Sequence, residues 1–194
     1  MARTFAVTFD YRCPFARNAH EHVLDGLESG ADWAVRFVPF SLSQSKEATW
    51  TREADSALLT LELAIAVRDT QPDRFLATHR NLFAIRHDHG KSTRDADAID
   101  EALVTAGVDV EAAKAEVASG RPLETVRTEH EAAAKEHTVW GVPTFIAGEH
   151  AAFVRLMERP ANATTAATPA VERILDLLEG WSELNEFKHT ALPR

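Results

Sequence analysis

The order of apolar and polar positions predicts strands near both ends of the chain and helices between them. Residues 4–9, Thr-Phe-Ala-Val-Thr-Phe, carry the aromatic and β-branched side chains of a short strand. Residues 14–28 have the spacing of a helix that ends at Ser29-Gly30. Residues 33–38 then alternate apolar and variable side chains, as a second strand does. The chain therefore begins with the order β-α-β.

From about residue 53 to residue 137 the strand signals vanish and helical spacing takes over. A Gln-Pro pair separates the first two predicted helices, and Gly107 ends the third. The apolar or capping residues that mark the five helices are Ala54, Leu58, Leu61 and Ile65; Phe75, Leu76, Leu82 and Phe83; Ile99, Leu103 and Ala106; the N-cap Asp109; and the run from Pro122 to His137.

Strand-forming residues occur again toward the C-terminus. Residues 142–147 and 150–154 flank a Gly-Glu turn and predict a β-hairpin. The last helix has Val171, Ile174, Leu175 and Leu178 on one face and reaches Gly180. The order β-α-β, helices, β-β-α predicts an α/β fold in which a helical subdomain, residues 49–137, is inserted into a small sheet domain, residues 1–48 and 138–194.

The composition excludes some classes of binding partner and indicates the cellular compartment. The 194 residues are 45% hydrophobic, enough for a sizeable core, and the formal net charge of −9 disfavours nucleic acid and anionic membrane surfaces. No apolar run approaches the length of a membrane span. One cysteine cannot form an internal disulfide, and the first residues lack the apolar core of a signal peptide, so we expect a cytoplasmic protein. The oligomeric state stays open, with a homodimer as one option.

The candidate reactive group is Cys13, which follows the first strand and opens the first helix. A helix N-terminus favours a thiolate, and Pro14 suits the first helical position. We therefore expect a thiol pKa below the ordinary value of about 8.5, lowered further if Arg12 and Arg17 face the sulfur. The alternatives are a cysteine that only fills apolar space and arginines that are merely solvated.

The histidines do not predict a metal site. His20 and His22, like His87 and His89, are two residues apart, which places them on different helix faces, and no cluster has ligand spacing. We expect them on the surface. His130 and His137 share a helix face, and one of them could donate a proton in a cleft, although exposure is again the expectation.

Two separated motifs carry a family resemblance. Cys13-Pro14-Phe15-Ala16 after the first strand, with Gly141-Val142-Pro143-Thr144-Phe145 before the third, resembles a thioredoxin fold. The helical insertion makes the whole chain similar to the DsbA-like branch, which includes kappa-class glutathione transferases and 2-hydroxychromene-2-carboxylate isomerases. The motifs that resemble mycothiol-dependent reductases are Ile99-Asp100-Glu101-Ala102-Leu103, Ala106-Gly107, Val154-Arg155-Leu156, Arg159-Pro160 and Glu186-Phe187-Lys188.

The resemblance implies a substrate site around the cysteine. In that fold the proline before the third strand is cis and lies against the reactive sulfur. Pro143 would therefore be cis, and Val142 would present its backbone to the substrate. Phe15 would lie beside the sulfur, where its ring can pack a substrate or simply pack against the helices. We expect the substrate-binding residues to be Pro14, Phe15, Val142 and Pro143, with Cys13 as the catalytic residue.

The chain departs from the reductase pattern at Ala16, where a second cysteine is usual. The implied activity is thiol-disulfide exchange by a monothiol mechanism, with mycothiol or glutathione as co-substrate, a disulfide or electrophile as substrate and no tightly bound cofactor. An isomerase or kappa-type transferase, in which the motif activates a bound thiol, is an alternative, although those relatives usually carry serine at the position of Cys13. A thioredoxin-like binding module without activity is the third.

Overall fold

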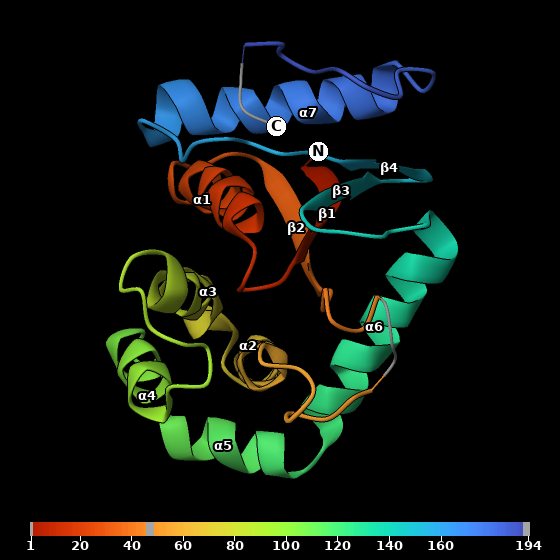
Figure 1. The fold of residues 1–194 in the computed structure, drawn as a ribbon. Coiled ribbons are helices and arrows are strands. Elements are labelled where there is room, and N and C mark those ends of the chain that lie inside the picture. Colours follow the sequence, from red (N-terminus) through yellow and green to blue (C-terminus); the bar gives the residue numbers. More distant parts are fainter. Residues whose placement is uncertain (1, 46–48, 192–194) are drawn as a thin grey trace.

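A four-stranded sheet with the order β2-β1-β3-β4 forms the centre of the sheet domain (Figure 1). The structure is a computed structural model that describes residues 2–45 and 49–191. β1 (Arg3–Phe9) runs parallel to β2 (Trp33–Pro39) over its full length. β3 (Thr144–Ala147) pairs antiparallel with β1 and with β4 (His150–Phe153). Because β1 is central, the chain that leaves its end emerges beside the start of β3.

Two helices cover one face of this sheet. α1 (Pro14–Glu28) contacts β1, α7 (Thr168–Gly180) contacts β3 and β4, and the two helices contact each other. A single π-helical turn, Ala163–Ala167, precedes α7 and packs on α1. Gly26 lets α1 approach the ring of Trp33, since a Cβ at this position would overlap that ring.

The helical block lies between β2 and β3 in the chain and on the far side of α1 from α7 in Figure 1. α3 contacts α1, and α6 contacts β2, so the block is joined to the sheet domain at two places. Aspartates cap two of its helices, with Asp95 accepting from the Ala98 N–H and Asp109 from the Ala112 N–H. The helices are α2 (Leu58–Thr70), α3 (Pro72–His87), α4 (Ala96–Thr105), α5 (Val110–Ala118) and α6 (Arg121–His137).

The predicted α/β order, with a thioredoxin-like sheet and intervening helices, is confirmed. The first helix of the block begins at Leu58 rather than near residue 53, because the residues before it form turns in which Asp55 bonds to Ser41 and pairs with Arg12 of the sheet domain. The π-helical turn was not predicted. The proposed boundary between residues 48 and 49 adjoins residues 46–48, which lie outside the described residues. Within the described residues no helix is both long and apolar enough to cross a membrane.

Candidate active site

Cys13 occupies the junction between β1 and α1. β1 ends at Phe9, and the turn that follows is closed by the Cys13 N–H, which donates to the Asp10 carbonyl at 3.0 Å. Cys13 is the N-cap of α1, and Pro14 is the first residue of the helix. Its sulfur accepts a hydrogen bond from the Ala16 N–H at 3.5 Å. Ala16, in the position of a second motif cysteine, is fully buried. The first helical turn thus points its free N–H groups toward the sulfur.

The segment before β3 closes the other side of the site. The Cys13 Sγ lies 3.4 Å from the carbonyl oxygen of Val142, and the Val142–Pro143 peptide bond is cis. The Thr144 N–H donates to Thr8 Oγ1 at 2.8 Å, which fixes this segment to the end of β1. The structure therefore brings together the residues that the two motifs predicted as neighbours, although they are 129 positions apart in the chain.

The expected lowering of the Cys13 pKa is wrong. Cys13 is only 7% exposed, and this burial raises the pKa of its thiol. The N–H groups of Ala16 and Phe15 lower the pKa, and the charge of Asp10 raises it, but burial has the largest effect. The neutral thiol also suits its two contacts, because it donates to Val142 and accepts from Ala16.

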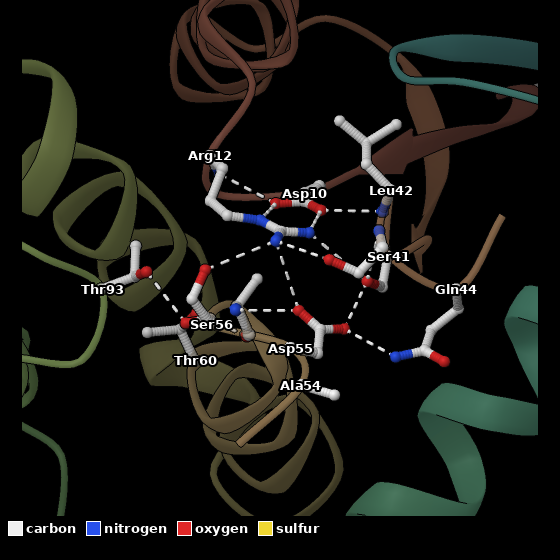
Figure 2. Close-up of polar contacts among 12 residues, drawn as sticks. Asp10, Arg12, Ser41, Leu42, Gln44, Ala54, Asp55, Ser56, Thr60 and Thr93 are labelled. Carbon is white, nitrogen blue, oxygen red and sulfur yellow. Dashed lines mark hydrogen bonds and ion pairs between the residues drawn. The ribbon is translucent and has the colours of Figure 1, made fainter. Parts of the chain in front are cut away.

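Arg12 does not act on the sulfur but on a buried carboxylate network (Figure 2). Its guanidinium lies between Asp10, whose Oδ2 is 2.6 Å from Nη2, and Asp55, whose Oδ1 is 3.4 Å from Nη1. Asp10 also accepts from the N–H of Leu42, and Asp55 accepts from Gln44 at 3.0 Å. The network joins the turn before Cys13 to two parts of the chain between β2 and α2, one at Leu42 and one at Asp55.

Arg17 is likewise occupied by carboxylates. Its guanidinium is buried against Glu21 and lies 2.5 Å from Asp88 at the end of α3. Arg159 reaches the other oxygen of Asp88 at 3.0 Å. The expectation that Arg12 and Arg17 would be merely solvated is therefore wrong, because both are paired with carboxylates, and the alternative that they lower the thiol pKa directly gains no support from these contacts.

Phe15 packs partly buried against the core, next to the cysteine. The guanidinium carbon of Arg155 lies over its ring, 5.0 Å from the centroid. Trp140, just before the Val-Pro segment, is 66% exposed and contacts the ring of Phe153. Aromatic surface thus lies on both segments that flank the sulfur.

The expectation of surface histidines is wrong for His20, His22 and His130, which are all buried. His20 is fully buried, where its Nε2 pairs with the Thr8 carbonyl at 3.1 Å and its Nδ1 with Nε2 of His79 at 2.8 Å. Tyr11 completes this chain through His79 Nδ1, at 2.8 Å. Sequence spacing did not indicate it, because the partners come from β1, α1 and α3.

His22 and His130 are also buried. His130 stacks on Phe40, with ring centroids 4.1 Å apart, rather than facing Cys13. Among the described residues, no group of three or more histidine, cysteine or acidic side chains could hold a metal ion.

Comparisons with known proteins agree with this geometry. None of the curated proteins compared with the chain matches it. Among solved structures, it is similar to a periplasmic thioredoxin-like protein from Salmonella enterica serovar Typhimurium, at 20% identity and a TM-score of 0.59, covering 91% of this chain and 86% of that one. The catalytic domain of Proteus mirabilis ScsC matches at 18% identity and a TM-score of 0.63, with coverages of 91% and 83%.

A third structure is the cytosolic disulfide reductase DsbM from Pseudomonas aeruginosa with GSH, at 14% identity and a TM-score of 0.59, covering 78% of this chain and 89% of that one. At these identities the likeness establishes the fold. The model of the DSBA-like thioredoxin domain family matches residues 5–161. That match spans most of the chain, from β1 through the cysteine and the Val-Pro segment, and the chain therefore belongs to the DSBA-like thioredoxin domain family.

Proposed function

We propose that this protein is a thiol-disulfide oxidoreductase that works through Cys13 alone, with a low-molecular-weight thiol as co-substrate. The observation that carries the proposal is the position of the sulfur, between the first turn of α1 and the Val142 carbonyl. A disulfide or a mixed disulfide placed against that backbone would meet the sulfur directly. The protein's structural neighbours include a cytosolic disulfide reductase and a thiol-disulfide exchange protein, which supports the same chemistry.

The proposed step is exchange with an external disulfide. Cys13 loses its proton to water, its thiolate attacks one sulfur, the old S–S bond breaks, and the leaving thiolate takes the electron pair and later a proton. Cys13 is then oxidised to a mixed disulfide while one thiol is released. Because Ala16 offers no second sulfur, a second small thiol must attack the mixed disulfide and regenerate Cys13.

The buried position of Cys13 favours a second candidate. A neutral S–H that donates a hydrogen bond, as it does to Val142, could donate to the sulfur of a bound thiol instead and stabilise that thiolate without being oxidised. This is the role expected for an isomerase or a kappa-type transferase, and a serine hydroxyl could fill it as well.

Mass spectrometry and one pair of variants separate these functions. The reduced protein is incubated with glutathione disulfide or mycothiol disulfide, and the adduct mass and its release by excess thiol are measured. We expect one adduct, on Cys13, released with turnover and absent in Cys13→Ala and Cys13→Ser. Turnover of an electrophilic substrate retained in Cys13→Ser, without adduct in the native protein, would establish the transferase or isomerase class. No adduct and no turnover would leave a binding module.

The remaining assignments follow from this proposal. We propose a reducing, cytoplasmic compartment, which a lone unpaired cysteine tolerates best, and small-molecule thiols and disulfides as the reaction partners. The resemblance of the C-terminal motifs supports mycothiol as the thiol, and the presence of GSH in the DsbM structure supports glutathione.

A further inference from the structure

The segment after β4, residues 154–159, lies against the active site at three points. The Val154 N–H donates to the Pro143 carbonyl at 3.1 Å, next to the backbone that contacts Cys13. Asn18 of α1 donates to the Leu156 carbonyl at 2.9 Å. Between these two bonds, Arg155 places its guanidinium over the ring of Phe15. Arg155 is therefore held beside the first turn of α1, which carries the sulfur.

Arg155 differs from the other arginines around the site in having no carboxylate partner. Arg12 lies between Asp10 and Asp55, and Arg17 and Arg159 share Asp88. In residues 2–45 and 49–191 the structure gives Arg155 neither an ion pair nor a hydrogen bond, and its side chain is exposed.

A cation–π contact holds a guanidinium without using its N–H groups. All five donors of Arg155 thus stay free for a ligand. A guanidinium presents them in a fork that matches the two oxygens of a carboxylate.

We propose that Arg155 binds a carboxylate of the disulfide or thiol that reacts at Cys13. The proposal rests on the function proposed above and names the class of its co-substrate: a low-molecular-weight thiol that bears a carboxylate, as glutathione does, rather than an uncharged one such as mycothiol. The net charge of −9 repels anions as they approach, so a preference for an anionic disulfide requires a local cation. Among the described arginines near Cys13, Arg155 has no carboxylate partner and can bind such an anion.

The test compares three small disulfides of similar size and different charge: dithiodipropionate, bis(hydroxyethyl) disulfide and cystamine. The rate of adduct formation on Cys13 is measured by mass spectrometry for the native protein and for Arg155→Gln. We expect Arg155→Gln to slow the reaction with dithiodipropionate about fivefold or more relative to the neutral disulfide, which corrects for any change in the Cys13 thiol itself. Arg155→Lys should retain part of the preference.

Arg173→Gln is the matched control, because Arg173 is an exposed arginine of α7 with no ion pair among the described residues. Its neighbour Glu172 pairs with Arg3 at the start of β1, about 20 Å of strand away from the end that leads to Cys13. The control should leave the three rates in proportion.

Equal slowing of all three disulfides by Arg155→Gln, no slowing, or the same effect from Arg173→Gln would overturn the role of Arg155. Failure of every disulfide to modify the native protein would instead refute the proposed function, so the two failures are distinct.

Discussion

Acid should unfold this protein at a higher pH than its carboxylates alone would cause, because two histidines are buried in a chain of hydrogen bonds. His20 donates through Nε2 to the Thr8 carbonyl, so its Nδ1 must accept, and it accepts from Nε2 of His79. His79 Nδ1 then accepts from the hydroxyl of Tyr11. Each ring carries one proton, and there is no partner for a second.

The direction and size of the effect follow from His20. Burial lowers the pKa of His20 from 6.5 to about 4, with a smaller opposing effect from the Thr8 carbonyl. Because the folded-state pKa is the lower one, His20 contributes its full stability above pH 6.5 and loses it as the pH falls toward 4. A shift of this size corresponds to about 3 kcal/mol of unfolding free energy. Burial lowers the pKa of His79 as well, which deepens the loss over the same window.

Urea unfolding at a series of pH values between 7.5 and 4.5 measures this loss. In the native protein the unfolding free energy should rise with pH near pH 5.5. We expect this slope to be smaller by about 1.4 kcal/mol per pH unit in His20→Gln, whose amide keeps the bond to Thr8 but cannot titrate. His150→Gln, at the exposed start of β4, should leave the slope as it is. Equal slopes in the native protein and His20→Gln would refute the argument that a neutral, buried His20 sets the acid limit.

Three further predictions test the site and the packing. Because burial raises the pKa of Cys13, its alkylation by iodoacetamide should speed up steadily through pH 9, and a plateau below pH 8.5 would contradict this. Gly26→Ala should destabilise the protein by about 1–3 kcal/mol in urea unfolding through overlap with Trp33, while Gly180→Ala, with open space around it, should not; equal effects would rule out the overlap. Asp55→Asn should destabilise the protein by about 3 kcal/mol, because it removes a fully buried carboxylate and leaves the partly buried Arg12 guanidinium with one carboxylate; an unchanged midpoint would show that the network is dispensable.

The sequence was sufficient for what depends on local spacing. The end of β1, the helix start at Pro14 and the Val-Pro segment before β3 each have a local signature, and a small sheet with β1 in the centre can bring them together in only a few ways. Ala16 in the place of a second cysteine was likewise visible and already excluded an internal dithiol.

What the sequence could not supply depends on what covers a residue from elsewhere in the chain. The sequence predicts the wrong direction for the Cys13 pKa, because the helix N-terminus is a local feature, whereas the burial of the sulfur involves a segment 129 residues away. His20 was expected at the surface because α1 shows no unusual pattern there, and its partners lie on β1 and α3. Asp55 offered no signal either, since a carboxylate before a helix is ordinarily exposed.

The raised thiol pKa and the missing second cysteine affect the chemistry in the same direction. A low thiol pKa stabilises the reduced state of an exchange protein and makes it a strong oxidant. Burial of Cys13 removes that stabilisation, and Ala16 removes the internal disulfide that such an oxidant would pass on. A thiol of high pKa is also a slow leaving group, so in the proposed mechanism a mixed disulfide on Cys13 would persist until an external thiol, bound in the correct position, attacked it. If the proposed function is correct, the protein should therefore reduce disulfides at the expense of a small thiol rather than oxidise protein thiols.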